Sequence, residues 1–396
     1  AHPAHHFTEN VTFSANYSWG FSRIFCESVR NILSPSFKAA MGGFTYLTRI
    51  SHTAEGQRFD KWQILLNTNE PLNVEQAHHQ VSVTENYIIL ADIAFQMEIS
   101  QVIVPLVINF TSMPNFLKRQ LTHLFLRPKK PKPYTNLYII NRHDLDNDTS
   151  AGEGNIQTVE AKKVVIPREV SHFFADFDDT ENCITLHVSH NNAWDVTEWI
   201  RAYDKPIKGE QLRTDLTSLV VGPMDVGFLG RYKIDGRNGA LLESKAMCDP
   251  DSTWAISLYT HRETDAQGNN AAQVSGKIED IYWLSWGFSA TIIPRRIYNS
   301  YKDYQYRGLP LESLRQPSGK FVDKPVQLLR LNTESMQVED SHQFEPGYFV
   351  SSPQFIPVDR ADSASADGSN CEKVSEGKRL STSGYIVCIV YKDDEY

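Results

Sequence analysis

Apolar and polar residues alternate along much of the chain, the pattern of β-strands that bury one face. A period of two is clear in five segments, at 86–95, 137–141, 183–188, 230–235 and 385–391. Polar turns separate them, and no short repeat is visible. The pattern predicts an all-β fold, which is a sandwich, a barrel or a propeller with diverged blades.

Two turns predict hairpins between neighbouring strands. The glycine-containing stretch 235–239 lies between the apolar segments 232–234 and 240–242. The acidic stretch 178–182 lies between the apolar residues 173–174 and 184–186. Both combine turn-forming residues with flanking strand-forming residues, so each pair of strands is expected to be antiparallel.

Helical spacing of apolar residues interrupts the strand pattern at two places. The first is 20–33. The second lies within 102–133, where an apolar run at 102–108 is followed by a helical face carrying Leu121 and Leu124 and then by the basic stretch 127–133. Neither apolar piece is long enough to span a bilayer. Region 102–133 therefore predicts either a peripheral membrane contact or a helix packed on the core beside a solvated basic loop.

Composition narrows the class of protein only modestly. The 396 residues are 41% hydrophobic and 22% charged, which is typical of a globular protein, and the net charge of -9 argues against nucleic acid as a partner. The five widely spaced cysteines favour reduced thiols and a cytoplasmic location.

We expect one partial domain over 1–396, with a polar surface loop at 359–380. Because the last predicted strand is half-paired, we also expect sequence to be missing at both ends.

Three histidines stand beside predicted strands or turns, namely His2, His79 and His172. Their separations match no local metal motif, so only the tertiary fold can bring them together. Imidazole is a good ligand for Fe(II), and three such side chains pointing to one place would form a metal site. The neighbouring His78 faces the other way if this segment is extended. Five other histidines are expected to be structural or exposed: His5, His6, His187, His190 and His261.

The sequence around these histidines resembles the carotenoid cleavage oxygenases. Ala-His-Pro at 1–3, followed by Thr-Phe-Ser-Ala-Asn-Tyr at 12–17, resembles the family's first histidine motif. His79 with Thr-Glu-Asn-Tyr-Ile at 84–88 resembles the second. His172, ahead of an acidic turn and an apolar strand, resembles the third. The segment Ser-Pro-Gln-Phe-Ile-Pro at 352–357 resembles a fourth, and the four matches follow the family's order.

The resemblance implies a fold, a cofactor and a reaction. It implies a seven-bladed β-propeller, incomplete in this chain, with helical insertions capping one face and Fe(2+) held on its axis. The histidines at 2, 79 and 172 would be three of four iron ligands. The implied enzyme is a dioxygenase that cleaves a C=C double bond of a carotenoid or apocarotenoid with O2. An apolar tunnel would hold the polyene.

Two departures from the family pattern leave other functions open. Its fourth histidine lies beyond this chain, and Ile292 and Ser352 stand where the family has glutamates that support the iron ligands. One alternative is therefore a catalytically impaired propeller that binds an apolar ligand, and another is a stilbene-type dioxygenase.

Near His172, the acidic residues Asp178 and Asp179 are expected to form a solvated turn rather than to support the metal, because adjacent carboxylates are costly to bury. Four tryptophans are expected in the core: Trp194, Trp199, Trp283 and Trp286.

Overall fold

The computed structural model describes most of the chain and the elements that carry the three histidines. The described residues are 2–18, 43–66, 70–74, 76–93, 113–114, 116–117, 132–146, 157–194, 198–201, 204–207, 212, 214–262, 276–315, 322–358 and 380–392. The predicted helices at 20–33 and 113–126 and the loop at 359–380 fall wholly or almost wholly outside these residues. No helix in the described ranges is long and apolar enough to cross a membrane.

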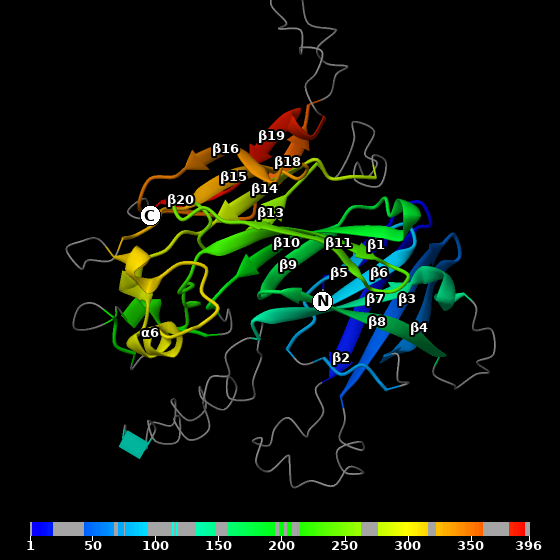
Figure 1. Cartoon of the computed structure of the whole chain (residues 1–396), viewed down its shortest axis with the longest axis horizontal. Coiled ribbons are helices and arrows are strands. Elements are labelled where there is room, and N and C mark those ends of the chain that lie inside the picture. Colours follow the sequence, from blue (N-terminus) through cyan, green and yellow to red (C-terminus); the bar gives the residue numbers. More distant parts are fainter. Residues whose placement is uncertain are drawn as a thin grey trace, which may run out of the picture.

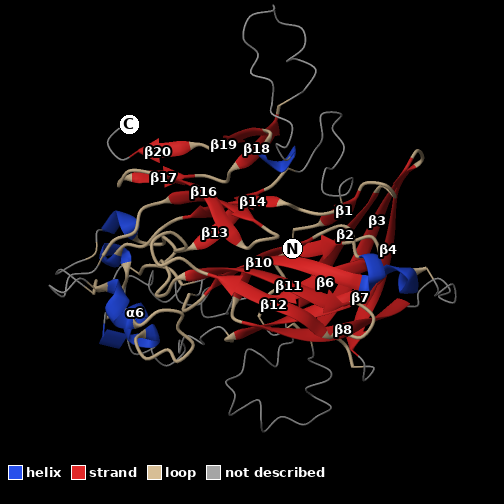
Figure 2. Cartoon of the chain, turned by 45° about the horizontal axis from the view of Figure 1, so that its top comes forward, coloured by secondary structure: helices blue, strands red, loops and turns tan. Residues whose placement is uncertain are grey.

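The fold is all-β, as the alternating pattern predicts, and most of its strands form four-stranded antiparallel meanders (Figures 1 and 2). The first contains β1 (Ala4–His6), β2 (Val11–Ser18), β3 (Phe44–Thr53) and β4 (Gly56–Leu66). The second contains β5 (Val81–Val83), β6 (Tyr87–Asp92), β7 (Tyr134–Asn141) and β8 (Gln157–Pro167). The third contains β9 (Val170–Ala175), β10 (Cys183–Asn191), β11 (Gly227–Asp235) and β12 (Leu241–Met247). The fourth contains β13 (Ile256–Thr260), β14 (Asp280–Ser285), β15 (Gln327–Asn332) and β16 (Gln337–Gln343).

The first two meanders are joined into one sheet. β4 and β8 pair in parallel, with Trp62 opposite Gln157, so the eight strands run in the order β1-β2-β3-β4-β8-β7-β6-β5. The free edges of this sheet meet where His2 forms a parallel bridge with Gln80. The sheet is therefore nearly closed, like a barrel, and the point of closure carries two of the three predicted ligands.

Strand β6 is buried on both faces because it separates two hydrophobic cores. Ile88 and Leu90 point into the eight-stranded sheet, where they pack with Phe13 and Trp62. The alternate residues of β6, including Ile89, pack in a second core against the third meander. This accounts for the near-continuous apolar run of β6, which is unusual for a strand that pairs antiparallel with both of its neighbours.

Both predicted hairpins are present. β9 and β10 pair antiparallel with Ala175 opposite Leu186, and β11 and β12 pair with Tyr232 opposite Ser244. The prediction of one strand over 385–391 is wrong. This segment forms β19 (Gly384–Val387), which pairs with β18 (Gln354–Pro357), and β20 (Val390–Lys392), which pairs with β17 (Tyr348–Val350). The chain changes partner because two different short strands border it in succession.

The helix α6 (Arg295–Tyr301) lies away from the eight-stranded sheet, beside the third and fourth meanders (Figure 1). Ile297 and Tyr301 anchor it in a separate apolar cluster with Trp254.

Of the four tryptophans predicted to lie in the core, three fit that expectation to different degrees. Trp194 and Trp283 are buried and Trp286 is partly buried, whereas Trp199 is 47% exposed. The expectation for Trp199 is therefore wrong.

Candidate metal centre

The three predicted histidines lie together, and backbone hydrogen bonds at the sheet closure fix two of them. The amide of His2 donates to the carbonyl of His79 at 2.5 Å, and the amide of Val81 donates to the carbonyl of His2 at 3.0 Å. The rings of His2 and His79 meet edge to face, with their centroids 4.5 Å apart. The ring of His172, from β9, packs against His79 at 5.0 Å between centroids.

The His79–His172 pair has the spacing expected of two ligands on one ion. Their Nε2 atoms are 3.2 Å apart. Two imidazole nitrogens bound to one ion at about 2.1 Å, roughly at right angles, lie about 3 Å from each other. Without an ion, one Nε2–H donates to the other nitrogen. The donor set and the spacing of this pair therefore fit a metal such as iron.

Burial keeps both rings neutral. Burial is the main cause that lowers the pKa of His79 to about 4, and the charge of nearby His2 contributes to the same shift. Burial also lowers the pKa of His172 to about 3, with smaller contributions from His79 and His2. At neutral pH each imidazole is uncharged and has one nitrogen that carries a lone pair, which is the form that binds a cation.

Side chains on one face of the segment 80–84 hold His79 and His172 in register. β5 and β9 are edge strands of different sheets. Gln80 Oε1 accepts from the amide of Phe173 at 3.4 Å, and Ser82 Oγ accepts from the amide of Ala175 at 3.0 Å. Because residues at i and i+2 share a face, Gln80 and Ser82 both bond the backbone of β9 just after His172. We call these contacts the β5–β9 seam.

The acidic turn completes this seam through Asp179. Its Oδ2 accepts from Thr84 Oγ1 at 2.5 Å and from the amide of Asn86 at 2.8 Å, and its Oδ1 accepts from Asn86 Nδ2 at 2.6 Å. Asp179 is only 1% exposed, so the expected solvated turn is wrong for this residue. Asp178 fits the expectation better, because it bonds locally to Thr180. The Thr-x-Asn part of the second motif thus binds the acidic turn of the third.

An aromatic group borders His172. Tyr259 of β13 lies 6.1 Å from the His172 ring and stacks on Phe174 at 4.5 Å between centroids. Trp283 packs on both aromatic rings, at 5.1 Å from Tyr259. Gln80 Nε2 donates to the Tyr259 hydroxyl at 2.9 Å, so one side chain ties the β5–β9 seam to β13. These rings give one side of the histidine group an apolar wall with a single hydroxyl.

Carboxylate support for the candidate ligands is missing among the described residues. His172 Nδ1 is buried and has no hydrogen-bond partner there. Ile292 packs in the cluster around α6 and Ser352 is exposed, so neither touches the histidines in any described contact. In the described ranges, no set of three or more His, Cys, Asp or Glu side chains is arranged to hold a metal ion. The site therefore consists of a pair at ligand spacing with His2 packed beside it.

The other histidines considered have structural roles where the contacts define them. His78 is buried, with Nδ1 bonded to the carbonyl of Ala91 at 2.8 Å, and it points away from His79 as predicted. His190 bonds the Tyr232 hydroxyl at 2.8 Å. His187 bonds Asp176 at 2.9 Å. A metal pair of His187 and His190 is not formed, because their ring nitrogens are bound to different partners.

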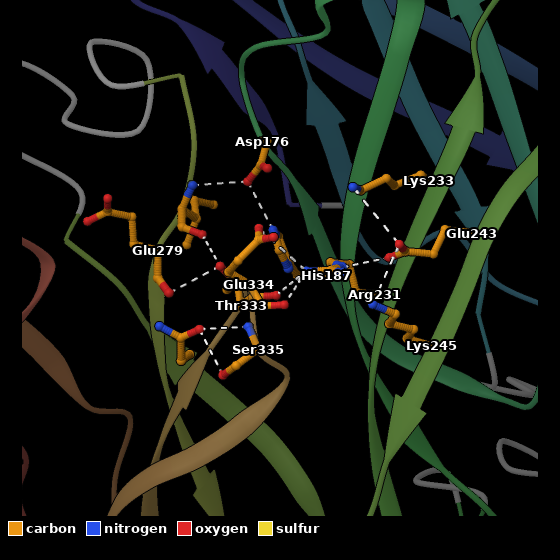
Figure 3. Close-up of polar contacts among 12 residues, drawn as sticks. Asp176, His187, Arg231, Lys233, Glu243, Lys245, Glu279, Thr333, Glu334 and Ser335 are labelled. Atoms are coloured by element: carbon orange, nitrogen blue, oxygen red, sulfur yellow. Dashed lines mark hydrogen bonds and ion pairs between the residues drawn. The ribbon is translucent and has the colours of Figure 1, made fainter.

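His187 belongs to a polar cluster between the third and fourth meanders (Figure 3). Asp176 Oδ1 accepts from His187 Nε2 at 2.9 Å and from the amide of Ile278 at 3.0 Å. Arg231 donates to the carbonyl of Thr333 at 2.6 Å and to Glu243 at 2.7 Å. We call this group the Asp176 clasp. Sequence patterns did not reveal it, because its members come from strands far apart in the chain.

Comparisons with known proteins come from solved structures. No family model matches the chain, and no curated protein matches it. It is similar to two single-residue mutants of Synechocystis apocarotenoid oxygenase, at 14% and 15% identity, both with a TM-score of 0.45. It is also similar to an ACO/RPE65 chimera, at 13% identity and a TM-score of 0.45. Each match covers 99% of this chain and 56% of the solved one, so the chain spans little more than half their length.

Proposed function

We propose that the chain is part of a carotenoid cleavage oxygenase, an Fe(II) dioxygenase that cleaves a C=C bond of a carotenoid or apocarotenoid. One observation carries the proposal: His79 and His172, 93 residues apart in sequence, place their Nε2 atoms 3.2 Å from each other with His2 against His79. The ordered histidine motifs support it. In the complete protein we expect seven propeller blades, of which this chain supplies a part.

Each part of the site has a role in this proposal. The Nε2 atoms of His79 and His172 would hold the ion, with His2 beside them. A ferrous ion there would supply the activation of O2 that cleavage into two carbonyl products requires. The β5–β9 seam orients the two rings. Phe174, Tyr259 and Trp283 would exclude water from one side of the pair. A polyene has no group that binds metal strongly, so apolar contacts would have to hold it.

Anaerobic titration with Fe(II), followed by calorimetry, tests the proposal. We expect His79→Ala and His172→Ala each to weaken binding by more than about 100-fold, since loss of a mere supporting contact costs 10–100-fold. His342→Ala is the matched control, because His342 is exposed on β16. Unchanged affinity in both site variants, with the proteins folded, would remove the metal centre and the proposed reaction with it.

A second function is binding of an apolar ligand without turnover. Its specific support is the partnerless Nδ1 of His172, together with Ile292 and Ser352 where the family has glutamates. Without a carboxylate partner an imidazole is a weaker ligand. Substoichiometric iron combined with tight binding of an apocarotenoid would favour this function. Stoichiometric iron and carbonyl products would favour the dioxygenase.

The proposal includes the surface on which the substrate is collected. Region 102–133, most of which falls outside the described residues, would contact membranes peripherally from a cytoplasmic protein. Its apolar positions and basic stretch suit a lipid surface with anionic headgroups. Co-sedimentation with anionic and neutral liposomes tests this part separately. Binding that ignores both lipid charge and salt would contradict it.

A further inference from the structure

A cavity on the third meander contains charged groups that the proposed reaction does not use. Its volume is about 470 Å³, and it opens between the end of β8, the outer strands β11 and β12, and the segment that follows α6. Pro167, Arg168 and Glu169 form one side, and Tyr306 and Arg307 form another. With Pro133, which precedes β7, the cavity is built from four separate parts of the chain.

Arg307 is the most informative residue of the cavity. Its side chain is only 10% exposed, yet both terminal nitrogens, Nη1 and Nη2, lack a hydrogen-bond partner among the described residues. Nε donates to the carbonyl of Leu309 at 2.9 Å, and the nearest carboxylate oxygen, on Asp225, is 3.8 Å from Nη2. A buried guanidinium with unused donors is costly unless an acceptor reaches it.

Asp225 is already committed to other donors. Its oxygens accept from the amides of Val226 at 2.9 Å, Gly308 at 2.5 Å and Leu309 at 3.1 Å. These bonds hold the loop of Arg307 in place, and they leave the carboxylate too far away to satisfy the guanidinium. The cation is thus positioned by Asp225 but not neutralised by direct contact.

Arg168 adds a second cation on the opposite side. Its guanidinium lies 3.8 Å from the centre of the Phe228 ring. Asn192, in the amide orientation that satisfies its neighbours, accepts from Arg168 Nη1 and donates to Glu169 Oε2, each at 3.1 Å. Two arginines and an apolar lining that includes Pro133 and Ala246 therefore share one cavity.

Glu169 does not cancel this positive charge fully at neutral pH. Burial raises its pKa to about 7, although the bond from the Tyr304 hydroxyl and the charge of Arg168 oppose that rise. Other polar or titratable groups near it belong to several elements: Asn192, His190, Asp225, Tyr232 and Cys248. When Glu169 is protonated, Asp225 and Glu312 are the carboxylates that still act on Arg307.

We infer that this cavity binds a small organic carboxylate, whose anionic end pairs with Arg307 and whose apolar end lies among the prolines and tyrosines. A guanidinium offers two parallel N–H donors, and a carboxylate accepts them with two oxygens. The side chains of Pro133, Pro167 and Ala246 suit the apolar end of such a ligand, and Ser244 and Tyr306 place hydroxyls in the same lining. The lining contains none of the three histidines of the proposed iron centre.

Titration of the full chain with benzoate, followed by calorimetry, tests the inference. We expect millimolar or tighter binding, and a loss of at least about tenfold in Arg307→Gln, which removes one charged pair worth about 1.4 kcal/mol or more. Arg307→Lys keeps the charge but not the fork and should give an intermediate affinity. Arg58→Gln is the control, because the Arg58 side chain is 73% exposed and distant in sequence from the cavity.

Two further probes separate the alternatives. Benzamide has the ring without the charge, and inorganic phosphate has charge without the ring. Equal binding of benzamide would show a merely apolar cavity, and tighter binding of phosphate would show an anion site without preference for carboxylates; either result overturns the inference. No binding of benzoate to the folded wild type, or unchanged binding in folded Arg307→Gln, overturns it as well.

A pH series sharpens the assignment. Ionised Glu169 repels the anion, so benzoate affinity should fall by up to about tenfold between pH 6 and pH 8. Glu169→Gln should bind benzoate with little dependence on pH over the same range. A wild-type affinity that rises with pH would contradict the placement of the anion beside Glu169.

Discussion

Two histidines on neighbouring strands, the half-buried His172 of β9 and the buried His187 of β10, are held in opposite ways. His187 Nε2 bonds the carboxylate of Asp176 at 2.9 Å. His172 Nε2 faces another imidazole at 3.2 Å, and no carboxylate is among its described contacts. Both rings have a buried Nδ1 that no described group reaches. The difference therefore lies in what stands at Nε2.

The partner at Nε2 decides what each ring can do. An ionised carboxylate only accepts, so Asp176 fixes the proton of His187 on Nε2 and leaves no lone pair there for a metal. His172 is free to carry its proton on Nδ1 and to offer Nε2. Its position comes instead from the β5–β9 seam, in which Gln80 and Ser82 bond the amides of Phe173 and Ala175, directly after it in β9. A ring held by its backbone keeps its nitrogen for other chemistry.

Removing the Asp179 carboxylate should have the largest effect. Asp179→Ala loses three hydrogen bonds to a buried charged acceptor, so we expect a loss of about 4 kcal/mol in the free energy of unfolding, with weaker Fe(II) binding at His79 and His172. Urea denaturation measures the first and calorimetry the second. Asp178→Ala, next to it in the turn, should cost about 1 kcal/mol or less. Equal effects of the two changes would mean that the seam does not depend on Asp179.

Breaking the Asp176 clasp should be costly without touching the metal site. Asp176→Ala leaves His187 Nε2 and the amide of Ile278 buried without an acceptor, so we expect a loss of about 3 kcal/mol in unfolding free energy. Fe(II) affinity should stay within about threefold of wild type, since His172 and His79 keep their own contacts. A folded Asp176→Ala protein that no longer binds Fe(II) would show that the clasp and the seam act together.

Acid should destabilise the protein through the candidate ligands. The folded-state pKa values of about 4 for His79 and about 3 for His172 lie below the usual value of 6.5. The unfolded chain therefore binds more protons as pH falls, and stability present above pH 6.5 is lost progressively toward pH 3. From pH 6.5 to 5 we expect a loss of about 2 kcal/mol. His172→Gln should lose less over this interval in metal-free urea melts; an equal slope would assign the effect to other groups.

Removing one bond of the β5–β9 seam should have the smallest effect. Ser82→Ala leaves the amide of Ala175 without its acceptor, at a cost of about 1 kcal/mol in unfolding free energy. This bond helps to position β5 against β9 and thereby His79 against His172, so its loss should lower Fe(II) affinity a few-fold. Ser341→Ala on β16 serves as the control, since Ser341 is exposed. An effect on stability without any change in affinity would separate the seam from ligand positioning.

The sequence predicts the parts of this fold that depend on local patterning. Alternation located the strands around Ile89 and Leu186, and turn residues located both hairpins. The three histidines emerged from ordered motifs, and the structure brings them together. These features depend on neighbours in the chain, where a period of two or a turn residue carries the information.

The features that the sequence did not predict depend on contacts between distant segments. Burial of Asp179 requires Thr84 and Asn86 as partners, and without them an acidic turn looks solvated. The parallel pairing of Trp62 with Gln157, the break near Cys388 and the exposure of Trp199 likewise depend on which strand lies alongside. The periodicity of one strand does not determine which other strand pairs with it.

The alternation along β6 has a consequence for how this part of the protein unfolds. Ile88 and Leu90 belong to one core and Ile89 to the other, so a single strand is a wall common to both. Neither core can open while its neighbour stays intact, and amide exchange at these three residues should require opening of both together. Insertion of one residue here would exchange the two faces and present each core with the wall built for the other.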